Sequence, residues 1–427
     1  MINSPTRNFS LLLLALMAPG VYGAGPGTKV TAKDWPWWRG PNRNGVANGA
    51  SYPVAWSRTK NVLWTATLPG RGHSTPTVVG PNVLLTTADE KAQTQSILCL
   101  DRATGKPCWQ KVLHRGGFET EIHKKCSHAA ASVASDGQRL FTVFLNHKAI
   151  WLTALDFSGR VLWQKKVCAF TSKFGFGASP LIHDGHVIIA SDNMGGGFLT
   201  AYDRRTGKVV WNTPRQGTPS YSSANVARVA GRLQLLIAGG DKITSYNPTS
   251  GQLLWSQKGA SVQTVSTMAF TDTLVFASGG YPTKETLCFD ARGNGKLMWR
   301  EKGNIANVPC MLVHAGSLYL VTDNGVAWCR DVATGKPRWS ARLKGEFSAS
   351  PTLAGDHIYA VNETGTVFIF KANPKKFESV AEITMGSEGF ATPVACGGRI
   401  FLRVAEETSG KRIEKLYCVG RSKNGTP

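Results

Sequence analysis

The sequence is poor in charged residues, especially acidic ones, and it contains no long apolar run. Only 18% of its 427 residues are charged, whereas 46 are glycine and 13 are tryptophan. This balance excludes a coiled coil or a helical bundle, which would be rich in Ala, Glu, Lys and Leu. No apolar stretch is long enough to cross a bilayer as a helix. Since 42% of the residues are hydrophobic, the composition indicates a large, glycine-punctuated, mostly β protein rather than a disordered chain.

Motifs built from neighbouring cysteines are also missing. The nine cysteines include no CxxC motif and no adjacent pair. Because nine is odd, at least one thiol is unpaired within a monomer even in an oxidising compartment. Cys99, Cys288 and Cys329 lie in apolar segments, where a free thiol packs as a small core residue. One or two disulfides stay open as alternatives.

The first 23 residues have the pattern of a secretory signal peptide. Arg7 and the amino terminus supply positive charge, and an apolar core of about nine residues, Ser10–Ala18, follows. Pro19 and Gly20 end this core ahead of a small-residue cleavage position near Gly23. The alternative is an interfacial anchor, which the short core disfavours. The pattern predicts export to the periplasm or the exterior, without a lipid anchor, because no cysteine lies near the cleavage position.

The formal net charge is +22, with 49 Lys and Arg against 27 Asp and Glu. A charge of this size predicts attraction to polyanions such as anionic lipid surfaces, acidic polysaccharide or an acidic protein. The basic residues are scattered over turns, and export disfavours nucleic acid, so no nucleic-acid partner is expected. The alternative is a solvated basic surface with no specific partner.

One phrase recurs along the chain and is its strongest signal. It reads DRATGKPCW at 101–109, DRRTGKVVW at 203–211 and DVATGKPRW at 331–339, with looser copies at 156–163, 247–255 and 290–299. Each copy ends in tryptophan, and the NVLW segment at 61–64 resembles the end of a further copy. The repeated tryptophans are Trp64, Trp109, Trp163, Trp211, Trp255, Trp299 and Trp339.

Each position in the phrase has a physical role. Asp or Asn accepts hydrogen bonds from the backbone two residues on, and Gly takes the left-handed conformation that closes a hairpin. Apolar runs on either side read as strands. A large ring at a fixed distance along the second strand most simply packs one repeat on the next. The tryptophans are therefore interpreted as structural rather than as ligand contacts.

Four strands in every 40–45 residues predict the blade of a β-propeller. First strands begin near His73, His128, Phe176, Tyr221, Thr264, Asn307, Phe347 and Phe390. The seventh repeat has Phe377 in place of tryptophan, and the eighth lacks its outer strand, which the strand at Asn61–Trp64 can supply. The prediction is an all-β, eight-bladed propeller of four-stranded antiparallel blades over residues 61–420, closed by an N-terminal strand. A seven-bladed ring is the alternative.

The remaining segments flank this ring. Residues 24–60 contain the Trp/Pro-rich run Asp34–Gly45, and Pro36 prevents Trp35, Trp37 and Trp38 from forming one strand. We therefore expect this segment to cap one face of the propeller. Residues 421–427 are a polar tail.

The phrase in an eight-bladed pattern resembles the pyrroloquinoline-quinone-type repeat of quinoprotein alcohol dehydrogenases and of the outer-membrane assembly protein BamB. The run Asp34–Gly45 looks like that of exported BamB-like propellers common in planctomycete-type bacteria. The resemblance implies the fold, and it implies either of two activities, since a propeller hosts many functions.

The sequence departs from the quinoprotein pattern. Quinoprotein dehydrogenases hold their cofactor with adjacent disulfide-bonded cysteines, a stacking tryptophan, an arginine and a calcium site beside a catalytic aspartate. Here no cysteines are adjacent, and the first strands begin with small polar residues rather than carboxylates. The resemblance therefore implies a non-catalytic, monomeric, BamB-like interaction scaffold without a cofactor. It would bind an envelope protein or an anionic polymer, with peripheral association with the outer membrane.

Two alternatives remain. One is a dehydrogenase that uses pyrroloquinoline quinone and calcium to oxidise an alcohol or a sugar. The other is a carbohydrate-binding module in which Trp35, Trp37 and Trp38 serve as stacking platforms.

The contact surface is predicted at the insertion between the first two repeats and the starts of neighbouring first strands. His114, His123, Cys126 and His128 crowd this insertion, and Cys126 and His128 would face the same way in an extended chain. The spacing matches no zinc motif, so no metal is predicted, although a metal site is the alternative. The candidate binding residues are Arg71, His73, His123, Cys126, His128, Phe176 and Tyr221.

Overall fold

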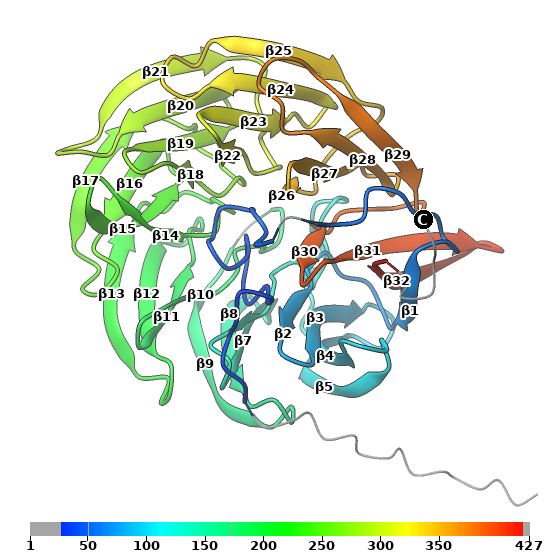
Figure 1. Cartoon of the computed structure of the whole chain (residues 1–427). Coiled ribbons are helices and arrows are strands. Elements are labelled where there is room, and N and C mark those ends of the chain that lie inside the picture. Colours follow the sequence, from blue (N-terminus) through cyan, green and yellow to red (C-terminus); the bar gives the residue numbers. More distant parts are fainter. Residues whose placement is uncertain (1–26, 50, 172, 422–427) are drawn as a thin grey trace, which may run out of the picture.

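The computed structural model describes residues 27–49, 51–171 and 173–421. The predicted signal peptide at 1–23 and residues 422–427 of the polar tail lie outside the described residues. The described residues form eight four-stranded antiparallel sheets arranged in a ring (Figure 1). In this part of the chain, no helix has the length and hydropathy to cross a membrane.

The sheets follow one another along the chain, each running from an inner to an outer strand. Blade one has β2 (Thr77–Val79), β3 (Asn82–Asp89), β4 (Thr94–Asp101) and β5 (Pro107–Arg115), and blade two has β6 (Ala134–Ser135), β7 (Leu140–Asn146), β8 (Ala149–Leu155) and β9 (Val161–Ala169). Blade three has β10 (Leu181–His183), β11 (His186–Ala190), β12 (Gly197–Asp203) and β13 (Val209–Arg215), and blade four has β14 (Asn225–Val229), β15 (Arg232–Ala238), β16 (Lys242–Tyr246) and β17 (Leu253–Lys258). Blade five has β18 (Ala269–Phe270), β19 (Leu274–Gly279), β20 (Glu285–Asp290) and β21 (Lys296–Lys302), and blade six has β22 (Leu312–His314), β23 (Ser317–Val321), β24 (Val326–Asp331) and β25 (Pro337–Arg342). Blade seven has β26 (Thr352–Ala354), β27 (His357–Val361), β28 (Thr366–Lys371) and β29 (Ser379–Thr384), and blade eight has β30 (Val394–Cys396), β31 (Arg399–Thr408), β32 (Lys411–Val419) and β1 (Val62–Leu68).

Blade eight combines the two ends of the ring. Its outer strand is β1, which pairs antiparallel with β32 so that Trp64 lies opposite Cys418 and Leu68 opposite Glu414. The predicted eight-bladed propeller closed by an N-terminal strand is therefore confirmed, and the seven-bladed alternative is wrong.

The repeated phrase forms the hairpin between the third and fourth strands of a blade. In blade one, Asp101 Oδ1 accepts the backbone N–H groups of Ala103 and Thr104 at 3.1 and 2.8 Å. Gly105 has φ +73° and donates its N–H to the carbonyl of Asp101 at 2.8 Å. Because this positive φ is strained for residues with a Cβ, the glycine is required for the turn.

The tryptophan that follows the turn lies against the turn of the next blade. A Cβ on Gly159 of blade two would lie 3.0 Å from the ring of Trp109 of blade one, and Trp109 Nε1 donates to the carbonyl of Phe157 at 2.9 Å. The same relation joins Trp299 of blade five to Gly335 of blade six, with Nε1 donating to the carbonyl of Val332 at 2.9 Å. Each contact packs a half-buried indole between sheets, so it fixes the spacing of neighbouring blades.

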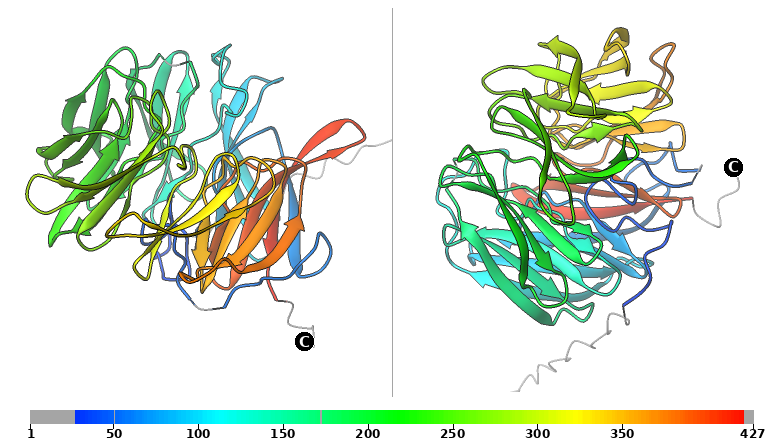
Figure 2. Two further views of the ribbon diagram at one scale, coloured as in Figure 1. Left: turned by 90° about the horizontal axis from the view of Figure 1, so that it is seen from above. Right: turned by 90° about the vertical axis from the view of Figure 1, so that its left-hand side faces the viewer.

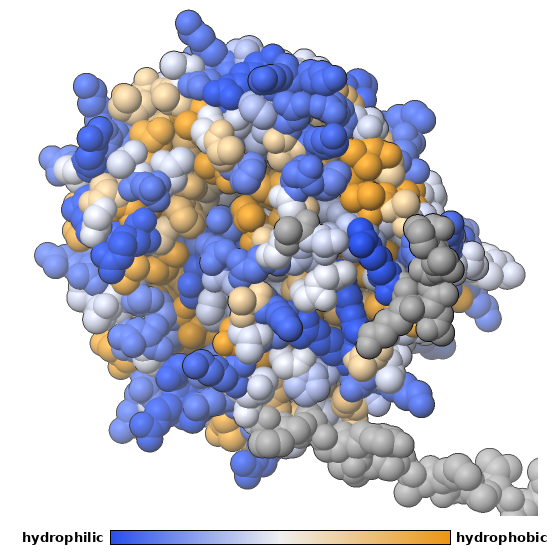
Figure 3. Space-filling view, viewed as in Figure 1, coloured by the Kyte–Doolittle hydropathy of each residue, from blue (hydrophilic) through white to orange (hydrophobic). Residues whose placement is uncertain are grey.

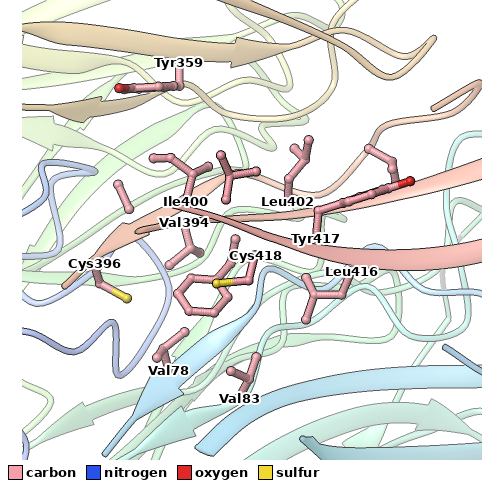
Figure 4. Packing of buried hydrophobic residues seen from close by; sticks show 14 of the residues in the cluster. Val78, Val83, Tyr359, Val394, Cys396, Ile400, Leu402, Leu416, Tyr417 and Cys418 are labelled. Atoms are coloured by element: carbon pink, nitrogen blue, oxygen red, sulfur yellow. The ribbon is translucent and has the colours of Figure 1, made fainter. Parts of the chain in front are cut away.

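The apolar core lies between the sheets. At blade eight it joins Val78 and Val83 of blade one to Tyr359 of blade seven through Ile400, Leu402 and Leu416 (Figure 4). All of these side chains are buried. Blade eight therefore packs against both of its neighbours, blades one and seven, through a continuous apolar core.

Residues 27–49 and 51–60, called the N-terminal cover, lie across one face of the ring (Figures 1 and 2). Trp35 forms a β-bridge with Val78 of blade one, and Val46 forms one with Leu353 of blade seven. Arg39 is buried and donates to the carbonyls of Pro351 and Met311 at 2.9 and 3.1 Å. The cover therefore forms hydrogen bonds with blades one, six and seven.

Hydrophilic side chains dominate the circumference of the face on which the cover lies (Figure 3).

Candidate binding funnel

A cavity of about 350 Å³ lies on the axis of the ring, and we call it the axial funnel. It is lined by Trp38 and mostly by the connections that precede the first strands. In an antiparallel four-stranded blade, these connections lie at the same end as the turns between the second and third strands. We call this end the mouth face, and the N-terminal cover lies at the other end.

The narrow part of the funnel is a ring with one small residue from each blade. We call it the throat ring, and its members are Thr75, Ser132, Ser179, Ser223, Thr267, Cys310, Ser350 and Thr392. All eight are buried.

Neighbouring members of the throat ring are hydrogen-bonded from blade to blade. The N–H of Ser132 donates to Ser179 Oγ at 3.0 Å, and the N–H of Ser179 donates to Ser223 Oγ at 2.9 Å. The N–H of Ser350 donates to Thr392 Oγ1 at 3.1 Å. These bonds satisfy backbone groups that the short first strands would otherwise leave unpaired.

Trp38 forms the floor of the funnel. It belongs to the N-terminal cover, lines the cavity, and donates its Nε1–H to Thr267 Oγ1 of the throat ring at 2.8 Å. The funnel is therefore open at the mouth face and closed at the other end by an aromatic ring.

An apolar surface lies at the mouth on blades three to five. We call it the apolar crescent: Phe174, Tyr221 and Tyr281 line the funnel, and Met194 lies in the turn between β11 and β12 at the same end of the ring. Phe174, Met194 and Tyr281 are 36%, 56% and 65% exposed. The rings of Phe174 and Tyr221 are 6.0 Å apart and edge to face. Exposed aromatic groups that gather around a cavity mark interaction sites in soluble proteins.

Charged groups lie on the other side of the mouth. Lys125, in the insertion between blades one and two, contacts Glu346 and Glu363 of the blade six and seven connections at 2.5 and 2.9 Å. Burial opposes its charge, but the hydrogen bonds to these carboxylates outweigh burial and raise the pKa of Lys125. The insertion is thus fixed across the mouth by an ion pair.

His73 lies at the edge of the funnel and is stacked on Phe390, with ring centroids 4.5 Å apart. Burial, followed by the charges of Arg71 and Arg403, lowers the pKa of His73 well below its usual value. The imidazole is therefore neutral near pH 7. Arg71 lies beside it, 3.6 Å from Glu388.

The structure brings most of the predicted contact residues together. His73, His123, Cys126, Phe176 and Tyr221 all line the axial funnel. Arg71 lies at the rim but does not line the cavity. His128 lies apart from the funnel, with its ring tilted against that of Phe118 at a centroid distance of 4.3 Å.

The expectation that Cys126 and His128 face the same way is wrong, because the chain turns here instead of extending. Cys126 lines the funnel, whereas His128 lies in a separate crevice. Burial raises the pKa of the Cys126 thiol and lowers the pKa of His128. No cluster of His, Cys, Asp or Glu suited to a metal ion is found among the described residues.

Several residues of the mouth were not identified from the sequence. Phe174, Tyr281 and Lys125 lie in connections that share no repeated motif. The signal that the sequence offered was the presence of aromatic residues in its connecting loops. These residues come together only when the eight blades have closed into a ring.

The funnel does not fit pyrroloquinoline quinone with calcium. A calcium ion takes six to eight oxygen ligands, several of them carboxylates. The described residues that line the funnel offer hydroxyls, amides, imidazoles and aromatic rings, with no Asp or Glu among them. Lys125 is the lining residue with a fixed positive charge, and it already pairs with two glutamates.

These features define the class of protein: an eight-bladed β-propeller with an axial funnel that is capped on one face. A family model described as outer membrane protein assembly factor BamB matches residues 45–117, 93–339 and 313–374. The chain belongs to this family. It is 24% identical over 351 residues to the outer membrane protein assembly factor BamB of Yersinia pestis, covering 79% of this chain and 83% of that protein.

Solved structures share the fold at low identity. A europium-containing methanol dehydrogenase superposes with a TM-score of 0.70 at 13% identity, covering 92% of this chain and 98% of that one. BamB from Moraxella catarrhalis superposes with a TM-score of 0.59 at 15% identity, covering 85% and 98%. This chain is thus similar in architecture both to a dehydrogenase and to BamB. The fold alone does not distinguish a scaffold from a dehydrogenase.

Proposed function

We propose that this chain is an exported, non-catalytic, BamB-like scaffold that binds a protein of the cell envelope through its mouth face. It acts as a monomer in the periplasm or outside the cell, without a lipid anchor and with peripheral association with the outer membrane. Membership of the BamB family and the signal-like pattern of residues 1–23 support this proposal.

The observation that carries the proposal is the asymmetry of the two faces. The N-terminal cover occupies one face with its own buried contacts. The mouth face instead exposes the apolar crescent beside the pairs that Lys125 makes with Glu346 and Glu363. A protein partner can bury aromatic anchors and surround them with charge pairs, which is how interface energy concentrates in a few residues.

The net charge of +22 supports a partner with an acidic surface, since opposite charge raises the rate of encounter. Binding should therefore weaken at high ionic strength, where surface charges are screened.

Complementation tests the proposal. Deleting the gene should lower the amount of assembled outer-membrane proteins, and the wild-type chain should restore it. The double variant Met194→Ser/Tyr281→Ser should fail to restore it, because removing two interface anchors costs roughly tenfold or more in affinity.

The matched control is Val209→Ser/Leu253→Ser. These residues are 58% and 52% exposed, but they lie on outer strands β13 and β17, away from the mouth. This variant should complement fully. Equal behaviour of the two double variants, at equal abundance and equal melting temperature, would refute the mouth face as the contact surface.

A further inference from the structure

The throat ring has more hydrogen-bonding capacity than the ring itself uses. Ser179, Ser223 and Thr392 each use an oxygen lone pair to accept a backbone N–H from the neighbouring blade. Each of these hydroxyls also has a proton to donate. For none of the three does the described part of the chain supply an acceptor for that proton.

Thr75 is a more extreme case. It is 2% exposed and lines the funnel, and its Oγ1 has no hydrogen-bond partner of either kind among the described residues. Buried donors without acceptors destabilise a fold, so such groups are normally satisfied by water or by a ligand. The throat is therefore suited to a group with several oxygen atoms around its edge.

The surfaces above and below the throat are aromatic. Trp38 closes the floor, and its indole is fixed by the bond from Nε1 to Thr267 Oγ1 at 2.8 Å. Phe176 and Tyr221 line the wall toward the mouth. A ligand at the throat would thus meet apolar rings on its faces and hydroxyl donors at its edge.

The charges of the funnel favour a neutral ligand. Lys125 is held by Glu346 and Glu363, and burial keeps His73 neutral. No carboxylate lines the funnel in the part of the chain that the structure describes. An ionised ligand would lose its hydration here without gaining an unpaired partner of opposite charge.

From these observations we propose that the axial funnel binds a neutral sugar ring, stacked near Trp38 with its oxygen atoms accepting hydrogen bonds from the throat ring. A pyranose has apolar C–H faces and oxygen atoms around its edge, which matches the chemistry of the site. The volume of about 350 Å³ falls within the range of about 300–1,000 Å³ that is usual for small-molecule sites. This site is independent of protein binding at the mouth face, and either can exist without the other.

Titration of the purified protein tests the proposal. Glucose, N-acetylglucosamine and cellobiose are the neutral probes, and glucuronate and benzoate are the charged comparisons. Binding is followed by tryptophan fluorescence and by saturation-transfer NMR. The neutral sugars should give a saturable signal with Kd in the range of about 0.1–10 mM, and the charged ligands should bind more weakly.

The matched variants are Thr392→Val and Thr392→Ser. The first keeps the shape and removes the hydroxyl, so it should weaken sugar binding about three- to tenfold, as expected for one lost hydrogen bond. The second keeps the hydroxyl and should bind like the wild type. Because Thr392→Val also removes the acceptor for the N–H of Ser350, Trp38→Phe gives a second test: it should abolish the fluorescence change while the NMR signal persists, weakened.

Three results would overturn the proposal. The first is the absence of saturable binding by all neutral sugars up to about 50 mM. The second is unchanged affinity in a folded Thr392→Val protein. The third is a crystal soaked in the sugars that shows only ordered water in the throat.

Discussion

The indole of Trp64 in blade eight packs directly on Gly105 in the turn of blade one. A Cβ on Gly105 would lie 2.4 Å from Trp64 Cε3, and Trp64 Nε1 donates to the carbonyl of Arg102 at 3.1 Å. This contact joins the outer strand donated by the N-terminal region to the first complete blade. It is therefore the point at which closure of the ring can be tested most directly.

Gly105→Ala should destabilise the protein more than Gly231→Ala. Both glycines have positive φ, of +73° and +75°, so both substitutions incur about 1–2 kcal/mol of backbone strain. Only Gly105 faces a ring, whereas a Cβ on Gly231 meets open space. Urea unfolding of the two variants should therefore differ, with the lower midpoint for Gly105→Ala. Equal midpoints would mean that the indole moves aside without cost.

The ion pair between Arg403 and Glu414 should be costly to break and much less costly to replace. The two side chains are 1% and 2% exposed, with Nε and Oε1 2.6 Å apart. Glu414→Leu alone should lower the free energy of unfolding by about 3–5 kcal/mol, because it leaves a buried guanidinium without its carboxylate. The double variant Arg403→Met/Glu414→Leu should recover most of this loss, as measured by urea unfolding. A double variant as unstable as the single one would contradict this.

Arg39→Ala should release the N-terminal cover. Arg39 is 3% exposed and donates to the carbonyls of Pro351, Met311 and Asn44. Its loss leaves two buried carbonyls and one half-buried carbonyl short of a donor, so we expect a cost of about 2–4 kcal/mol. Limited proteolysis should then cleave within residues 40–60 faster than in the wild type. Arg58→Ala, at an exposed position of the same segment, is the control and should be cleaved at the wild-type rate.

Stability should fall as the pH drops from about 6.5 to about 4. Burial, and then the charge of His147, lowers the pKa of His114 from 6.5 to about 4. Between these values the unfolded chain binds more protons than the folded one, so acid favours unfolding and stability rises with pH across this window. His114→Gln should flatten this dependence in thermal melts. The difference between variant and wild type should be constant from pH 7 to 8, where His114 is neutral in both states.

The fold could be predicted because the same hydrogen-bonded turn recurs along the sequence. Asp101, Asp203 and Asp331 each cap a hairpin by accepting backbone N–H groups, and each is followed four residues later by a glycine of positive φ. A local hydrogen-bond pattern with fixed spacing is visible in one sequence. The missing outer strand of the eighth repeat identified β1 as its replacement, since an open sheet edge has to be paired.

The site could be predicted only in part, because no local rule positions its residues. His73, Phe176 and Tyr221 were found because the sequence placed them near the starts of first strands, which converge on the axis. In the structure they lie four or five residues before β2, β10 and β14 begin. Tyr281 and Lys125 were not predicted as site residues, because their positions depend on where long connections lie after the ring of blades has closed. His128 was misplaced for a related reason: a turn, not a strand, follows Cys126.

The pairing of β1 with β32 joins residues about 350 positions apart along the chain. Such a contact cannot form until nearly all of the polypeptide is available, and long-range strand pairing is slow because loop closure precedes the stabilising contacts. During synthesis, the first blades must therefore persist with an unfinished neighbour and an exposed sheet edge. A chain truncated at either end would lack the same blade, so the last residues made are as necessary to the architecture as the first.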